Sequence, residues 1–66
     1  MKEIFVKLVY AEDSAKIEKL FNVYRIGLNE WGKTGSLNYQ GTNLISYTII
    51  CTRDTFNAIE SAMDCN

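Results

Sequence analysis

The chain opens with a regular alternation of side chains. A period of two over residues 3–10 predicts a β-strand, because successive side chains of a strand point to opposite faces. One side of this strand is wholly apolar and the other includes a lysine. The two sets are Ile4, Val6, Leu8 and Tyr10 on one side, and Phe5, Lys7 and Val9 on the other.

A helical period follows this strand. The acidic and hydroxyl side chains of residues 11–14 suit a helix N-terminus, where they accept hydrogen bonds from free N–H groups and complement the helix dipole. Gly27 interrupts the apolar stripe, but the stripe keeps its phase beyond it, so we expect the helix to end near Gly32. The stripe comprises Ile17, Leu20, Phe21, Tyr24, Leu28 and Trp31.

Two more strands are expected in the second half of the chain. The turn-rich segment 32–35 precedes a short strand at residues 36–40, and residues 41–43 are typical of a hairpin loop. Residues 44–52 contain no glycine, proline or charge. This composition predicts a central strand.

A second helix is expected to run from Thr52 essentially to the C-terminus. Thr52 is a suitable N-cap, Asp54 lies in the first turn, and apolar residues recur at helical spacing thereafter. Cys51 would then end the third strand and Cys65 would lie at the far end of this helix. A helix of about 12 residues spans roughly 18 Å, which is too far for a disulfide, so we expect two free thiols.

The element order is β-α-β-β-α, which predicts one α+β domain over residues 1–66. The crossover rule predicts strand one parallel to strand three and strand two antiparallel, in a mixed three-stranded sheet of order 1-3-2 with both helices on one face. In topology the whole chain resembles a ferredoxin-like fold that lacks its last strand. That strand would cover the edge of strand one, so we expect this edge to pair with a second copy or with another protein by β-addition.

Charge and composition narrow the function classes. The 66 residues are 47% hydrophobic, which is ample for a folded domain. The net charge is −1 and the basic residues are dispersed, so binding to nucleic acid is disfavoured and an RNA-binding protein is a remote alternative. The sequence has no membrane-spanning apolar run and no signal-peptide pattern, which predicts a cytoplasmic protein.

Candidate chemistry is sparse. The chain has no histidine, so His-dependent triads and His-ligated zinc are excluded. Residues 32–36 include Gly-Lys-Thr, but they lack the upstream glycine of a phosphate-binding loop and follow a helix. We expect no cofactor, no metal site and no enzymatic activity.

The remaining means of action is a surface. We expect a small protein-binding regulator or inhibitor that docks on a larger protein, similar in style to phage-encoded inhibitors, antitoxins and anti-defence factors. The alternative is a dimeric module for a small ligand, similar in plan to ACT-type domains. We expect the uncovered sheet face to carry Phe5, Lys7, Val9, Ser46, Thr48 and Ile50, with Asn38 and Gln40 as further candidates. The expected contact residues are Phe5, Lys7, Val9, Glu12, Asp13 and Glu30.

Overall fold

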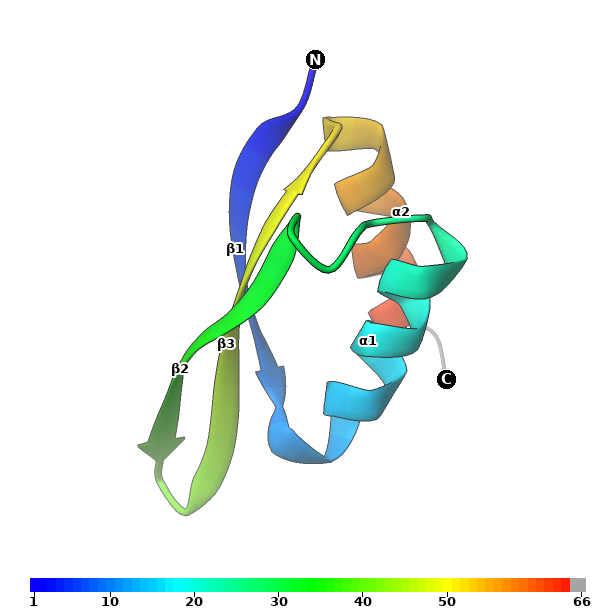
Figure 1. Ribbon diagram of the computed structural model, residues 1–66. Helices are drawn as coiled ribbons and strands as arrows, with labels where there is room; N and C mark the ends of the chain where they lie inside the picture. Colours follow the sequence, from blue (N-terminus) through cyan, green and yellow to red (C-terminus); the bar gives the residue numbers. More distant parts are fainter. Residues whose placement is uncertain (65–66) are drawn as a thin grey trace.

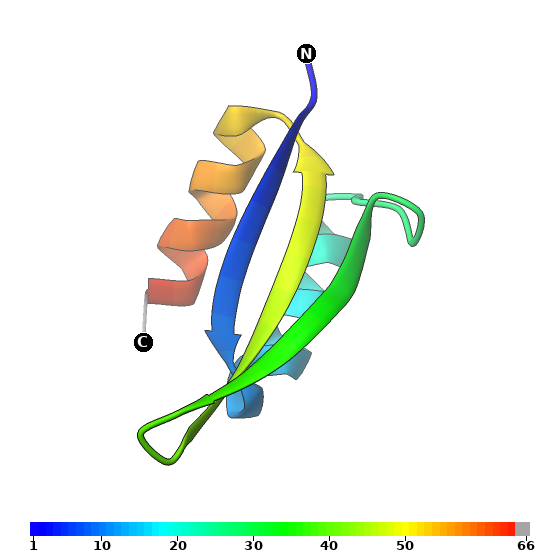
Figure 2. The same ribbon diagram turned by 90° about the vertical axis from the view of Figure 1, so that its left-hand side faces the viewer.

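The computed structural model describes residues 1–64 and consists of two layers, a β-sheet and a pair of helices (Figure 1). Both helices lie against one face of the sheet, and Figure 2 shows the opposite face without a covering element. No helix among these residues is long and apolar enough to cross a membrane. The elements are β1 (Glu3–Tyr10), the 3-10 helix η1 (Ala11–Asp13), α1 (Ser14–Val23), β2 (Trp31–Tyr39), β3 (Thr42–Cys51) and α2 (Arg53–Asp64).

The α+β class and the strand order 1-3-2 are confirmed, but the predicted strand directions are wrong. β3 lies in the centre and pairs antiparallel with both β1 and β2. The sheet is therefore fully antiparallel between neighbours, and it is not mixed. The crossover through α1 connects β1 to β2, which run in the same direction on either side of β3. The hairpin then reverses the chain, so β3 returns between them.

The first helix ends about nine residues before the predicted end near Gly32. Arg25 adopts a left-handed conformation with φ of 59°. The N–H of Ile26 donates to the carbonyl of Phe21 at 2.8 Å, and the N–H of Arg25 donates to that of Asn22 at 3.1 Å. These two bonds form a Schellman motif, which ends the helix and turns Ile26 into the core.

The predicted orientation of strand one is also wrong. Val9 is 5% exposed, and the ring of Phe5 stacks on Phe56 of α2 with centroids 4.3 Å apart. Lys7 bends under the sheet to Glu60 of α2, with 3.4 Å between Nζ and Oε2. The mixed set of β1 therefore faces the helices, because two apolar side chains and one lysine stem fit against α2.

A small core joins the two layers. Its centre is an aromatic cluster in which Phe21 lies 4.8 Å from Trp31 and 5.6 Å from Tyr47, measured between ring centroids. Trp31 reaches this cluster from the start of β2, not from a continued helix as predicted. The buried residues are Val9, Ile17, Phe21, Ile26, Tyr47, Ile49, Cys51 and Ile59.

The second helix begins as predicted. The N–H of Thr55 donates to the hydroxyl of Thr52 at 3.2 Å, which is the expected capping bond. Cys51 is a buried free thiol, as expected. Cys65 lies outside the described residues, so the expectation for its thiol stays a prediction.

The hairpin between β2 and β3 is tighter than the predicted loop at 41–43. Gln40 and Gly41 form the turn, and their φ values are 52° and 81°. Positive φ at both central residues defines a type I′ turn, in which Asn-Gly is the favoured pair. Gly41 matches the favoured pair, whereas Gln40 is less favourable than asparagine at the first central position of the turn.

We predict that Gln40→Asn stabilises the protein by about 0.5 kcal/mol, while Gly41→Ala destabilises it by about 1 kcal/mol, since a Cβ is unfavourable at positive φ. The measurement is urea unfolding followed by circular dichroism. Gln40→Ala is the control, and its free energy of unfolding should not exceed that of the parent protein. Equal stabilities of Gln40→Asn and Gln40→Ala would contradict the assigned turn type.

Candidate binding surface

The uncovered face of the sheet carries a continuous apolar row. Ile4 is 71% exposed and Val6 is 65% exposed, although both belong to the wholly apolar side of β1. Residues directly opposite one another in the strand pairing share a face, so the members of this face follow from the register. We call it the open face; it consists of Ile4, Val6, Leu8 and Tyr10 of β1, Thr42, Leu44, Ser46, Thr48 and Ile50 of β3, and Gly32, Thr34, Gly35, Leu37 and Tyr39 of β2.

Hydroxyl groups occupy the centre of the open face and bind one another. The Thr34 and Ser46 hydroxyl oxygens are 3.1 Å apart, and the Thr48 hydroxyl lies 3.3 Å from that of Thr34. The Thr34 hydroxyl also lies 3.3 Å from the carbonyl oxygen of Ser46. None of the open-face residues carries a charge. The open face is therefore apolar along β1, and the hydroxyl groups at its polar centre are hydrogen-bonded to one another.

A second feature is a groove along the free edge of β1. A hollow of about 120 Å³ is lined by four consecutive strand residues, 7–10, together with Asp13, Met63 and Asp64. Because successive side chains of a strand point to opposite faces, a hollow lined by four in a row lies along the edge of the strand. Figure 2 shows α2 beside this edge, on the side away from β3. We call this hollow the edge groove.

The opposite edge of the sheet is less regular. In β2 the pairing with β3 shifts register between Lys33 and Gly35, so that Thr34 is an extra residue of a bulge. Bulges twist an edge and leave it a poor template for another strand. The prediction of strand one as a sheet edge is confirmed, and β1 is the more regular of the two edges.

The predicted contact residues do not form one surface. Phe5, Lys7 and Val9 point toward the helices, and two of them, Lys7 and Val9, also line the edge groove. Asp13 lies at the rim of the same groove. Their roles as partner-binding residues stay predictions. The exposed row of β1 was missed because its apolar side chains favoured burial in the core.

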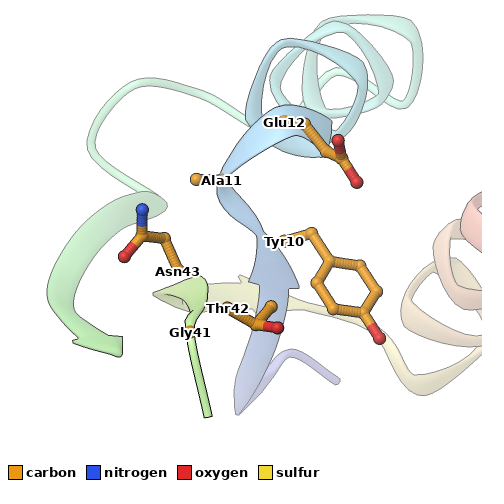
Figure 3. Close-up of a pocket in the computed structure, with 6 residues that line it drawn as sticks. All are labelled: Tyr10, Ala11, Glu12, Gly41, Thr42 and Asn43. Carbon is orange, nitrogen blue, oxygen red and sulfur yellow. The ribbon is translucent and has the colours of Figure 1, made fainter. Parts of the chain in front are cut away.

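Glu12 lies in a different hollow, at the end of the sheet. This hollow of about 330 Å³ forms where η1 follows β1 and passes the turn of the β2–β3 hairpin. Figure 3 shows the Tyr10 ring and the Glu12 carboxylate projecting to the same side, and Asn43 on the other side of the strand end. Ala11, Gly41 and Thr42 complete the lining. Glu12 and Glu30 therefore lie at opposite ends of the sheet.

Glu30 is held at the opposite end of the sheet. Its carboxylate pairs with Lys2 and accepts a hydrogen bond from the N–H of Gly27 at 3.2 Å. The hydrogen bond from Lys2 is the main reason that the pKa of Glu30 lies below its usual value. Cys51 is buried nearby, and burial raises the pKa of its thiol, with a smaller effect from the charge of Glu30. These contacts give Glu30 a structural role, while its role in partner binding stays a prediction.

A polar triad ties the sheet to α1. The Tyr47 hydroxyl donates to Glu18 at 2.7 Å, and Lys33 Nζ lies 3.3 Å from the same carboxylate oxygen. Burial raises the pKa of Tyr47, and the bond to Glu18 raises it further. The pKa of Glu18 is lowered, chiefly by the Tyr47 hydrogen bond; burial is the next largest effect and opposes it, while the hydrogen bond and charge of Lys33 add to the lowering. The triad therefore stabilises a neutral phenol and an ionised carboxylate.

Comparison with known proteins gave no match to a family model, a curated protein or a solved structure. The likeness to a ferredoxin-like fold therefore stays a resemblance of topology. Among residues 1–64, no group of three or more cysteine, aspartate or glutamate side chains is placed to hold a metal ion. The features that the structure offers for function are the open face, the edge groove and the hollow at Glu12.

We predict that folding stability falls as the pH rises above about 10, because the unfolded chain releases the Tyr47 proton before the folded protein does. Tyr47→Phe should remove this part of the alkaline loss. It should also cost about 1 kcal/mol at neutral pH, since Glu18 loses its donor. Urea unfolding at about pH 8 and about pH 11 measures both effects.

Tyr39→Phe is the matched control, because Tyr39 is 59% exposed. This variant should keep the alkaline loss of the parent protein. An alkaline loss of equal size in Tyr47→Phe and in the parent would show that the Tyr47 proton is not responsible.

Proposed function

We propose that this chain is a protein-binding domain, a small regulator or inhibitor that acts by docking on a larger protein. It docks by adding a strand of that protein to the free edge of β1. The observation that carries the proposal is the edge groove, which lies beside a regular strand and is bounded by α2 on its far side. An added strand takes its affinity from main-chain hydrogen bonds and its specificity from alternate side chains.

The length of β1 suits this mode of binding. The strand has eight residues, and β3 uses the backbone groups on one of its edges. In an antiparallel ladder, every second residue directs its N–H and C=O groups away from the neighbour. Half of the backbone of β1 therefore points into the edge groove or the solvent beside it, ready to pair with an extended segment.

The side chains around the groove leave this edge unguarded. Lysines often protect edge strands by projecting from them. Lys7 is the one charged residue of β1 beyond its first position, but its side chain is only 15% exposed and is engaged with Glu60. Met63 offers an apolar contact at the groove, while Asp13 and Asp64 contribute carboxylates. An extended segment with alternating apolar residues and a basic residue near these carboxylates fits the groove best.

The first test is affinity capture with cross-linking from lysate of the producing cells, followed by amide hydrogen exchange measured by NMR on the purified complex. We expect the partner to protect every second amide of β1, namely those that exchange rapidly in the free protein. The amides of β2 serve as the internal control and should not change. Recovery of no specific protein, or protection confined to β2 or the helices, overturns the proposal.

A second test removes single backbone donors. Chemical synthesis allows the amide before Leu8 or before Val9 to be replaced by an ester, which deletes one N–H and keeps every side chain. Since adjacent residues point to opposite edges, one ester should weaken partner binding by about tenfold at unchanged folding stability. The other should lower folding stability by about 1 kcal/mol. Unchanged partner affinity in both esters contradicts strand addition.

A further inference from the structure

The open face has a ridge over β1 and a trough over the start of β2, at the levels of Gly32 and Gly35; further along β2, Leu37 and Tyr39 are more than half exposed. The ridge is the row of Ile4, Val6 and Leu8 on β1, whose side chains are all more than half exposed. The trough lies over β2, where Gly32 has no side chain. Through the strand pairing, Val6, Thr48 and Gly32 lie at one level across the sheet. At the next level Leu8, Ser46 and Gly35 lie in line.

The trough is a real hollow beside Gly32. A space of about 190 Å³ is bounded there by residues 29–32 together with Thr48 and Ile50. A Cβ built on Gly32 meets no atom within 4 Å, so the bare backbone is not required by packing within one copy of the chain. The hollow has room for a branched aliphatic side chain of the kind that the ridge presents.

We propose that a second copy of this chain covers the open face, with a two-fold axis that lies between the two sheets and runs along β3. This rotation keeps each level of the sheet and exchanges the two outer strands, so β1 of one copy lies over β2 of the other. Val6 of each copy then enters the hollow beside Gly32 of its partner, and Leu8 lies over Gly35. Face-to-face packing of this kind is the normal way in which two sheets form a core about 10 Å thick.

The chemistry of the open face favours a second copy as its occupant. Like charges directly opposed across a two-fold axis repel, and no open-face residue is charged. The hydroxyls of Thr34, Ser46 and Thr48 already bind one another. They therefore enter the interface without leaving unpaired donors, which removes the usual cost of burying polar groups. The charged residue that lines the hollow, Glu30, is paired with Lys2 of the same copy. The interface is therefore largely apolar and has no unpaired charge at the hollow.

The area is sufficient for a stable pair. Six open-face residues are each more than half exposed, namely Ile4, Val6, Leu8, Tyr10, Leu37 and Tyr39. At about 100 Å² each they present on the order of 600 Å² per copy, so a dimer that covers all of them buries about 1,200 Å² in total, which is at the lower limit of stable interfaces. Patches of this size are at the upper end of those that monomers expose. The axis along β3 leaves the backbone edge of β1 free in both copies. Leu8 and Tyr10 belong to the open face and also line the edge groove, so the two surfaces adjoin at these side chains.

The test begins with the mass of the protein across concentration, measured by light scattering after size exclusion and by sedimentation. We expect a dimer at roughly 100 μM that dissociates on dilution toward about 1 μM. Val6→Asp should raise the dissociation constant by roughly a hundredfold, because a buried carboxylate would lack a partner. Leu28→Asp is the control and should change nothing, since Leu28 is 87% exposed in a loop away from the open face.

Gly32→Phe separates the specific dimer from non-specific apolar association. A Cβ at position 32 meets no atom within 4 Å, so the new ring extends from an open position into the trough of each copy. Gly32→Phe should abolish the dimer while the monomer keeps its circular dichroism spectrum. If the open face associated only through non-specific apolar contact, the added ring would instead strengthen association. In the pair Val6→Ala and Gly32→Val, each single change should weaken the dimer, and the double variant should recover it to within about tenfold of the parent.

Three outcomes overturn this inference. They are a protein that stays monomeric at about 1 mM, a dimer that tolerates both Val6→Asp and Gly32→Phe, and association that increases in Gly32→Phe. The second outcome would point to pairing through the β1 edges, and the ester variants of Leu8 and Val9 would then weaken the dimer. The docking proposal stands or falls on the protection of β1 amides by a partner, so the two can fail separately.

Discussion

The packing of one side of β1 against α2 determines both surfaces that this protein presents. Phe5 stacks on Phe56 at 4.3 Å, and Val9 is buried in the core. Because the side chains of a strand alternate, these two contacts force Ile4, Val6 and the rest of the wholly apolar row outward. The same contacts place α2 beside the free edge of β1, where it bounds the edge groove. A one-residue slip of β1 would reverse the open face and the core face together.

The sequence pattern predicted the order of the elements, because strong local periods determine it, and the order of the strands followed from the rules for crossovers and hairpins. It did not predict the end of α1. Leu28 and Trp31 kept the phase of the helical stripe by coincidence, whereas Arg25 and Ile26 form the Schellman motif that ends the helix. A left-handed residue other than glycine gives no clear signal in a sequence. The burial of Ile26 is a tertiary contact, which a local pattern does not contain.

The predicted strand directions are wrong because the prediction relates β1 to β3 by the crossover, whereas the crossover connects β1 to β2, and the hairpin then makes β3 antiparallel to both. The open face was predicted wrongly for a different reason. Either side of β1 is apolar enough to be buried, so the sequence alone favoured the side without a lysine. The structure buries the side with Lys7, because the stem of this residue packs beneath the sheet and its amino group reaches Glu60 at 3.4 Å. Hydrophobicity alone cannot distinguish these arrangements, since the choice depends on the shape of α2. The free edge of strand one was predictable, because it follows from the order of strands.

The two proposed surfaces use different chemical groups of the same strand. The open face offers the side chains of Ile4, Val6 and Leu8, while the edge groove offers backbone donors and acceptors. With the two-fold axis along β3, the β1 strands of the two copies lie on opposite sides of the dimer, and their free edges point away from each other. A dimer would therefore present two equivalent docking edges. For a target with two extended segments in reach of one another, the second contact becomes intramolecular, and binding is tighter than one edge alone provides.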